Sequence, residues 1–580
     1  MNAGIVNKFK LVFASCACAG FLTTSAAAPL QAAAQDLTQS LPMRVGNYIS
    51  PFGHYLAAFH AERQKNYSLA ADLLSVTRMR DDSNAFLQDN QHQWLVTEGR
   101  YVDAASLAEN LLKMSPDSIF GQRTLFVDAV SRDDWKAAKT FLPPFPEQGL
   151  DAYLVPLQTA WTAAQEGDHK AALEALQRFR EEPSLEPIGI ITEALLHEQA
   201  GNNQQAIDFY DKALNLYEVP PERLVALAGN LFERTDQTQR AQDLYSSFLV
   251  QSPRNHHIQA RLEAALQGKT ATPLISGPRA GLAEGAYALA RVIYRDKLDP
   301  VALTLANIAL HLSPSEPAYV LLAGRMLSDQ KRYNDALVLY ESISADSLAY
   351  YSTQLIKSNN LSDAGRFEEA ITLLKDLAKK QPERADALVQ LGNILRRNER
   401  NEEAAEAYDN AVSRTSDPSE LGWRTYYFRG IAHEQSGDWP AAEASLQQAL
   451  VLNPDQPLVL NYLGYSWADM KINLVEALDM LNRAVDSRPN DGYIVDSLGW
   501  VLFQLGRVEE ALPHLEKAVE ILPGDPVIND HVGDAYWLVG RKREARYQWR
   551  RALSFDPVEK DEKAINSKLE NGYPNETAEN

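Results

Sequence analysis

The chain has 580 residues, a formal net charge of −21 and only two cysteines, Cys16 and Cys18. A protein this acidic is repelled by nucleic-acid phosphates and by anionic lipid surfaces, so the composition argues against nucleic acid as a partner. Because both cysteines precede residue 35, the rest of the chain has no thiol for a disulfide, a nucleophile or a metal site.

Residues 1–34 have the layout of a secretory signal peptide. Two lysines precede a short apolar run at residues 11–22, and small residues lead to Ala34. The run is shorter than the ~20 residues that span a bilayer, so we expect cleavage that leaves Gln35 as the N-terminus of an exported chain without a transmembrane segment. The alternative is a lipid on Cys16, because Phe-Ala-Ser-Cys is a poor version of a lipoprotein box. The predicted location is therefore the periplasm, or the outer membrane if Cys16 is lipidated.

After a lead-in at residues 35–50, the sequence repeats with a period of about 34 residues. A glycine lies twelve residues before the recurrent alanine in six copies and five residues before it in seven, and a proline follows by twelve residues in seven copies. The first glycine allows two helices to approach closely, the second ends a helix in a left-handed conformation, and the proline closes the unit. The marker alanines are Ala70, Ala104, Ala138, Ala172, Ala206, Ala241, Ala302, Ala336, Ala370, Ala404, Ala442, Ala477, Ala511 and Ala545. A fixed period of this length indicates stacked helical hairpins.

This pattern resembles the tetratricopeptide repeat, and the best copies are residues 462–489, 497–523 and 531–557. The resemblance implies an all-α protein, a right-handed superhelical α-solenoid of about fourteen helical hairpins. We expect six units at residues 51–256 and eight units at residues 284–558.

Two segments interrupt or follow the repeats. The step from Ala241 to Ala302 is 61 residues long, and the extra residues at 257–283 include a stretch rich in Gly, Pro, Ser and Thr. This composition predicts a linker or hinge between the two arrays. Residues 559–580 form a polar tail that we expect to be frayed.

The sequence carries no catalytic motif that we can recognise. His197-Glu198 and His433-Glu434 begin like the helix of a zinc protease, but each lacks a second histidine four residues later. There is no Gly-Lys-Ser/Thr phosphate loop, and residues 281–285 lack the serine of a hydrolase elbow. We therefore predict no enzymatic activity, no cofactor and no metal.

The first helix of each unit is expected to line the concave face of the solenoid. In the last three units, register places aromatic, acidic and amide side chains on that face, and such a surface suits an extended protein segment with apolar and basic side chains. The alternative is that the rings pack as core between adjacent helices. The predicted partner-binding residues are Asn461, Tyr465, Asp496, Trp500, Phe503, Asp530, Asp534 and Trp537.

The segments at residues 460–465, 496–503 and 281–287 also resemble a narrower group, the large exported tetratricopeptide proteins of proteobacteria. That group includes an outer-membrane lipoprotein that is the adaptor of a carboxyl-terminal processing protease. The resemblance implies a scaffold or adaptor that binds a protein partner in the cell envelope, either a processing protease or an envelope assembly factor. The alternative is a structural scaffold that organises an outer-membrane-associated complex without delivering a client.

Overall fold

The computed structural model describes residues 51–79, 84–146, 149–297 and 299–573. All regular secondary structure in these ranges is helical, which confirms the predicted all-α class. None of the helices there combines the length and the apolar character that crossing a membrane requires. The predicted signal peptide and lead-in lie outside the described residues.

The chain divides into two compact units at Arg366 and Phe367. The first unit contains α3 (Pro51–Arg63), α4 (Tyr67–Arg78), α5 (Ala85–Thr97), α6 (Tyr101–Met114), α7 (Ile119–Ser131), α8 (Trp135–Thr140), α9 (Asp151–Gln165), α10 (His169–Glu174), α11 (Gln177–Glu181), α12 (Glu186–Gln199), α13 (Asn203–Leu214), α14 (Glu222–Arg234), α15 (Thr238–Gln251), α16 (His256–Leu266), α17 (Gly277–Arg295), α18 (Asp299–Leu312), α19 (Pro317–Asp329), α20 (Tyr333–Tyr340) and α21 (Tyr350–Asp363).

The second unit begins with the helix that follows this division. It contains α22 (Phe367–Lys380), α23 (Asp386–Arg397), α24 (Asn401–Val412), α25 (Pro418–Gln435), α26 (Trp439–Leu452), α27 (Pro457–Asp469), α28 (Leu474–Ser487), α29 (Gly492–Gln504), α30 (Val508–Ile521), α31 (Pro526–Leu538), α32 (Lys542–Leu553) and α33 (Glu559–Asn571). Within each unit, consecutive helices pack as antiparallel hairpins, as the repeat period predicts. The ninth expected hairpin, which carries Ala370, is split, because α21 and α22 fall in different compact units.

The repeat residues have the roles that the sequence predicts. All fourteen marker alanines have no exposed surface. A Cβ atom built on Gly229 would lie 2.4 Å from Tyr245 Cε1 on the second helix of the hairpin, so only glycine fits this crossing. The turn glycines are left-handed, for example Gly99 with φ +73°. Non-glycine residues such as Lys331 and Glu399 adopt the same conformation at the same position.

Replacing Ala511 by leucine is expected to destabilise the second unit by about 1–3 kcal/mol. Ala511 is fully buried in α30, so three extra carbon atoms have no free volume to occupy. Ala444 on α26 is exposed, and Ala444→Leu is the matched control, for which we expect a change of at most about 0.5 kcal/mol. Urea denaturation of the two variants measures the difference, and equal midpoints would mean that the assigned helix crossing is wrong.

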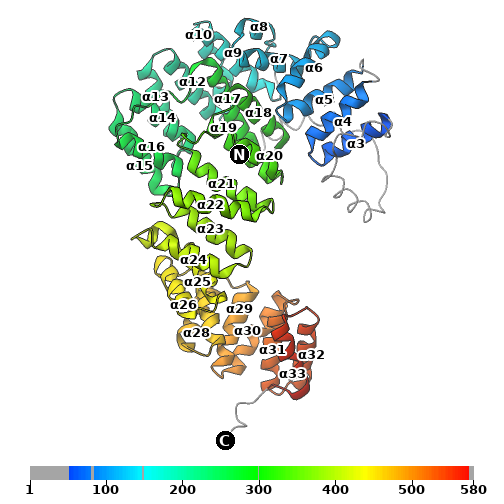
Figure 1. Cartoon of the computed structure of the whole chain (residues 1–580), viewed down its shortest axis with the longest axis vertical. Coiled ribbons are helices and arrows are strands. Elements are labelled where there is room, and N and C mark those ends of the chain that lie inside the picture. Colours follow the sequence, from blue (N-terminus) through cyan, green and yellow to red (C-terminus); the bar gives the residue numbers. More distant parts are fainter. Residues whose placement is uncertain (1–50, 80–83, 147–148, 298, 574–580) are drawn as a thin grey trace. The chain divides into compact units, whose positions relative to one another are not determined.

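The first unit is more than a linear stack of neighbouring repeats. Helix α17 packs against α9 and α12, and α18 packs against α5 and α7, so both helices contact repeats far away in the sequence. Figure 1 shows α17 and α18 inside the curve that α5 to α16 form. The first helices of these repeats therefore turn their inner faces toward two helices of the same chain.

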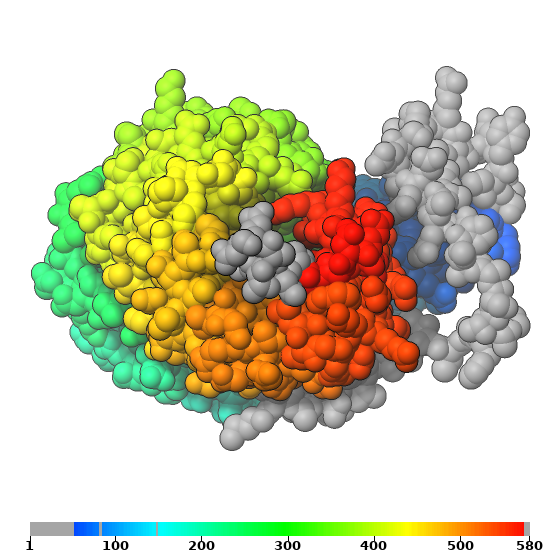
Figure 2. All heavy atoms as spheres, turned by 90° about the horizontal axis from the view of Figure 1, so that it is seen from below, coloured from blue at the N-terminus to red at the C-terminus, as the bar shows by residue number. Residues whose placement is uncertain are grey.

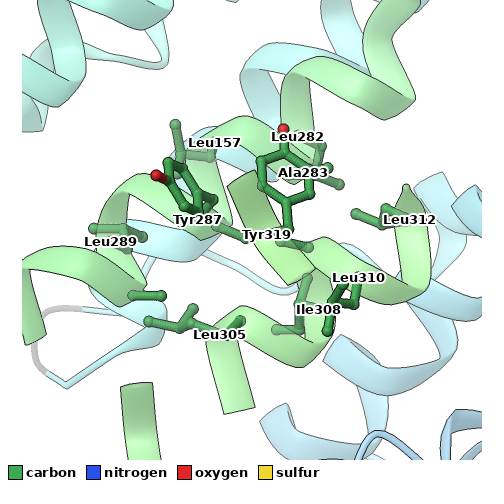
Figure 3. Packing of buried hydrophobic residues seen from close by; sticks show 14 of the residues in the cluster. Leu157, Leu282, Ala283, Tyr287, Leu289, Leu305, Ile308, Leu310, Leu312 and Tyr319 are labelled. Atoms are coloured by element: carbon green, nitrogen blue, oxygen red, sulfur yellow. The ribbon is translucent and has the colours of Figure 1, made fainter. Parts of the chain in front are cut away.

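Small residues and buried rings allow this close contact. A Cβ atom on Gly281 would lie 2.3 Å from Trp161 Cη2, and one on Gly285 would lie 2.9 Å from Leu157 Cδ1. Figure 3 shows Leu157 of α9 beside Tyr287 of α17 in the same apolar cluster. The interior of the curve is thus a close-packed core.

Hydrogen bonds between segments that are far apart in the sequence also hold the first unit together. Asn307 Nδ2 of α18 donates to the carbonyl oxygen of Thr97 at 2.6 Å, and Arg279 Nη1 of α17 donates to the carbonyl oxygen of Ser131 at 3.2 Å. Arg332 forms two bonds with Glu98, at 2.8 and 2.6 Å. These bonds fix α17 to α20 against the repeats at the start of the unit.

The predicted linker at residues 257–283 is mostly helical, which corrects the sequence-based interpretation. Only residues 267–276 between α16 and α17 are non-helical. Asn230 of α14 fixes this loop, because its Nδ2 donates to the Thr272 carbonyl at 3.0 Å and its Oδ1 accepts from the Leu274 amide at 3.2 Å. Of the glycines in the stretch that suggested a hinge, Gly281 instead provides space for Trp161. The predicted frayed tail at residues 559–580 also needs correction where the structure describes it, because residues 559–571 form α33, and residues 574–580 lie outside the described residues.

Candidate functional site

The eight predicted partner-binding residues lie on the first helices of three successive repeats, and we call them the inner strip. Asn461 and Tyr465 lie on α27, three residues lie on α29 and three on α31. The packed glycines Gly464, Gly499 and Gly533 align the three helices, because each contacts the second helix of its own hairpin. The strip therefore joins equivalent positions of α27, α29 and α31.

Two aromatic residues of the inner strip are buried in a ring stack. Trp500 is 8% exposed, and its ring stacks on Phe503 at 5.0 Å and on His531 at 3.8 Å between ring centroids. His531 comes from α31, so the stack joins two neighbouring first helices. Trp500 and Phe503 thus have the core packing that the sequence left open as the alternative, and their role in partner binding stays a prediction.

The carboxylates of the strip have specific partners. Asp496 Oδ2 lies 2.8 Å from His531 Nδ1, and Asp534 Oδ1 accepts a hydrogen bond from Trp549 Nε1 at 2.9 Å. Lys568 Nζ of α33 donates to Asp530 Oδ2 at 2.7 Å and to Asp534 Oδ2 at 2.6 Å. Three neighbouring first-helix carboxylates therefore hold one imidazole and one ammonium group.

Burial and mutual repulsion shift the pKa values of this cluster. Burial, together with the negative charge of Asp530, raises the pKa of Asp534 to about 7, although Lys568 opposes the shift. Burial by itself lowers the pKa of His531, but Asp496 and the other two carboxylates outweigh it, so the pKa of His531 is raised. Both groups thus bind protons more tightly in the folded chain than in the unfolded chain.

The second unit is therefore expected to lose stability as the pH rises from about 4 to above 7. The unfolded chain releases the Asp534 proton near pH 3.8 and the folded chain near pH 7, so the stabilisation is complete below the lower value and disappears through the upper one. His531 adds a further loss of stability as the pH rises above 6.5, because its pKa is also raised in the folded chain.

Thermal melting of the Asp534→Asn variant from pH 4 to 8 tests this expectation. An asparagine cannot titrate, so the variant should show a shallower decline in Tm than the wild type. Asp479→Asn is the control because Asp479 is exposed on the outer helix α28. A decline that is equally steep in all three proteins would contradict the assigned pKa shift.

Four polar atoms of the inner strip are buried and have no hydrogen-bond partner among the residues that the structure describes. Three are acceptors, the Oδ1 atoms of Asn461, Asp496 and Asp530, and one is a donor, Trp500 Nε1. Asp496 is 3% exposed, so its free oxygen has lost contact with water. A buried polar atom without a partner typically costs about 1–3 kcal/mol, which a bound segment with complementary groups recovers.

An exposed apolar row runs along the same helices, and we call it the rim. Leu458, Tyr493 and Val527 each lie six residues before the packed glycine of their helix, and they are 37%, 57% and 36% exposed. On a helix, residues separated by three or seven positions share a face, so the rim borders the inner strip. We did not predict these residues, although their constant offset from the glycine was visible in the sequence.

Further aromatic residues precede the strip on α25 and α27. The rings of Tyr427 and Tyr462 meet edge to face at 5.9 Å, and the guanidinium group of Arg396 lies 4.2 Å from the ring centre of Phe428. Tyr462 donates to Glu434 Oε2 at 3.0 Å. These half-buried rings continue the aromatic surface from α29 toward the start of the second unit.

The C-terminal helix α33 lies at the opposite end of the strip. Besides the Lys568 bonds, the ring of Tyr573 meets Phe503 edge to face at 5.6 Å. Figure 2 shows the red atoms of the last helix next to the orange atoms of the preceding repeats. The sequence signal for α33 was weak, because Ile565 and Leu569 are its only large apolar residues.

The described residues give no indication of metal chemistry. Among them, no group of three or more His, Cys, Asp and Glu side chains is arranged to hold a metal ion. His197 pairs with His169 at 3.1 Å, and His433 pairs with Asp409 at 3.0 Å. The two histidine motifs in the sequence thus take part in packing between adjacent helices.

Comparison with known proteins agrees with the fold. The tetratricopeptide repeat family model matches residues 357–420, 427–492 and 473–526. This part of the chain therefore consists of tetratricopeptide repeats, which typically bind protein partners and are typically non-catalytic. A TPR repeat-containing protein of Pseudomonas aeruginosa is 28% identical over 188 residues, which cover 32% of this chain and 31% of the relative. The chain thus spans about a third of that relative's length.

Solved helical-repeat structures also align with the chain. The MamA protein is 21% identical with a TM-score of 0.28, and the alignment covers 30% of this chain and 92% of MamA. YrrB, described as a TPR protein with an unusual peptide-binding site, is 22% identical over 30% of this chain and 86% of its own, with a TM-score of 0.27. The APC/C hetero-tetramer Cut9-Hcn1 is 16% identical over 94% and 99%, with a TM-score of 0.35.

Proposed function

We propose that this chain is a non-enzymatic scaffold of the periplasm that binds a protein partner on the inner strip and rim of its second unit. The observation that carries the proposal is the set of buried polar atoms without partners on α27, α29 and α31. Repeats of this family are protein-interaction modules, and the partner is the missing source of complementary hydrogen bonds.

An extended segment has the chemistry that this surface requires. Its backbone amides and basic side chains donate to the free oxygens of Asn461, Asp496 and Asp530, and a backbone carbonyl accepts from Trp500 Nε1. Alternate side chains of an extended chain point to one side, where the rim offers Tyr493 and its neighbours.

The charge around Tyr465 favours a basic segment. Burial, and then the charges of Asp469, Asp496 and Asp561, raise the pKa of the Tyr465 hydroxyl, which places these carboxylates around the strip. Opposite charge on the partner speeds encounter and excludes acidic competitors. The sequence resemblance supports a processing protease or an envelope assembly factor as the source of this segment.

The proposal is tested by capturing partners from an envelope extract with the full chain and measuring the affinity of each captured protein. Tyr493→Ala removes the one aromatic ring of the rim and should weaken binding about tenfold or more, as for an aromatic anchor. Asp530→Asn should mainly slow association and reduce its salt dependence. Tyr547 is 60% exposed on the outer helix α32, and Tyr547→Ala is the control.

The outcomes separate the inner strip from other surfaces. A partner that binds the Tyr493 and Asp530 variants as tightly as the wild type must use a different face. N-terminal sequencing of the captured chain tests the location: a start at Gln35 supports export by cleavage, and a lipid on Cys16 would instead place the protein on a membrane.

A further inference from the structure

The C-terminal segment, residues 559–573, covers one end of the inner strip. Lys568 contacts two strip carboxylates and Tyr573 contacts Phe503, as described above. A Cβ atom on Gly572 would lie 2.1 Å from Trp537 Cζ2, so the backbone there lies directly on the indole ring. Four of the eight strip residues therefore contact the end of their own chain.

This segment packs on the second unit through a small set of apolar side chains, Ile565, Leu569 and Tyr573. Ile565 is the only buried residue of α33, and most of the helix is charged and exposed. A helix of this length is marginal in water when it is not packed on other helices. The segment thus belongs to the parts of a protein that open before the core does.

The two carboxylates that Lys568 contacts require a positive charge between them. Asp530 and Asp534 converge through their Oδ2 atoms on one ammonium nitrogen. Asp534 is buried, so departure of Lys568 forces Asp534 either to bind a proton or to remain a carboxylate without a cation in poor contact with water. A single point of convergence suits the compact ammonium of lysine better than the planar fork of arginine.

We propose that α33 is a displaceable internal occupant of the inner strip, and that Lys568 holds the place of a lysine side chain from the partner. This inference rests on the proposed function, since it names the chemistry that the partner segment brings. When Lys568 of α33 is bound to Asp530 and Asp534, the partner's lysine cannot bind the same two carboxylates. The free chain therefore binds its partner less tightly than a chain whose α33 is released.

A labelled peptide with the sequence of residues 559–573 tests this competition against the full chain. In the wild type, the attached α33 has an effective concentration of about millimolar, so the peptide should bind weakly. Lys568→Glu reverses the charge at the two carboxylates and should increase peptide affinity at least tenfold. Lys563→Glu makes the same charge change on the same helix, where Lys563 pairs with Glu559 at 2.6 Å, and should behave as the wild type.

Hydrogen exchange supplies a second readout on the same proteins. The amides of α33 should exchange at least tenfold faster in Lys568→Glu than in the wild type and in Lys563→Glu. Ile565→Ser releases the helix without changing charge, and it takes the place of Lys568→Glu if that variant fails to fold. Equal peptide affinity in all variants, or unchanged exchange of α33, would overturn the inference.

The partner assay separates this inference from the proposed function. A captured partner that binds wild type and Lys568→Glu equally overturns the competition and leaves the binding function intact. A partner that binds Lys568→Glu more tightly, and that the peptide displaces, supports both. Recovery of no partner, with the peptide response as expected, contradicts the proposed function and leaves α33 as the internal occupant.

Discussion

Replacing Arg223 by methionine is expected to destabilise the first unit by about 3–5 kcal/mol. Arg223 of α14 is buried, and its guanidinium group donates to Glu284 Oε2 of α17 at 2.6 Å and to Glu316 Oε1 at 2.8 Å. The hydroxyl of Tyr319 donates to the same Glu284 oxygen at 2.8 Å. Without the arginine, Glu284 is a buried carboxylate with no cation. The free energy of keeping that uncompensated charge buried is the reason for the large loss of stability.

A double variant and a surface pair make this measurement specific. Arg223→Met combined with Glu284→Gln removes both charges, and it should recover part of the lost stability. Lys139 and Glu166 form an exposed pair at 2.7 Å, so Lys139→Met should cost less than about 1 kcal/mol. Denaturation followed by a probe in the first unit gives the values, and a loss below 1 kcal/mol for Arg223→Met would show that the cluster does not hold α14 and α17 together.

Replacing Trp500 by alanine is expected to destabilise the second unit by about 3–5 kcal/mol. Its ring lies between Phe503 and His531, and its removal leaves a cavity between α29 and α31. Tyr493 on the same helix is mostly exposed, so Tyr493→Ala should change stability by at most about 1 kcal/mol. Urea denaturation and circular dichroism check both variants.

This comparison decides the role of Trp500. If Trp500→Ala keeps wild-type stability and loses only partner affinity, the ring is a binding anchor and the packed arrangement is not what holds α29 and α31. If stability falls as expected, the exposed rim residue Tyr493 is the residue through which binding is altered without loss of the fold.

The repeat period made the helices predictable because each marker residue has a local cause. A buried alanine such as Ala511 and a packed glycine such as Gly229 are dictated by the crossing of two helices that are adjacent in the sequence. The left-handed turns were predicted only where glycine occupies them. Lys331 and Glu399 adopt the same turn because the helices on either side fix it, so residue type did not reveal them.

The contacts of α17, α18 and α33 could not be predicted in the same way. Nothing in the sequence around Gly281 and Gly285 indicates that Trp161 and Leu157 are their neighbours. The composition of residues 257–283 alone favoured a hinge. For the inner strip, register placed the eight residues on one face, but burial depends on what packs beside them. Neither His531 nor Lys568 follows from the repeat pattern, and these two residues determine which carboxylates are paired.

The inward packing of α17 and α18 gives the two units different folding behaviour. The bond from Asn307 to Thr97 joins residues 210 positions apart, and the bond from Arg279 to Ser131 joins residues 148 apart. A chain made from its N-terminus cannot close the first unit until α18 has been synthesised, and such long loops slow the search for the native state. In the second unit, the longest described side-chain bond, from Lys568 to Asp530, spans 38 positions, so folding can proceed one hairpin at a time. Until α18 arrives, the apolar inner faces of α5, α7, α9 and α12 stay uncovered, and this interval is when the chain is most prone to aggregate.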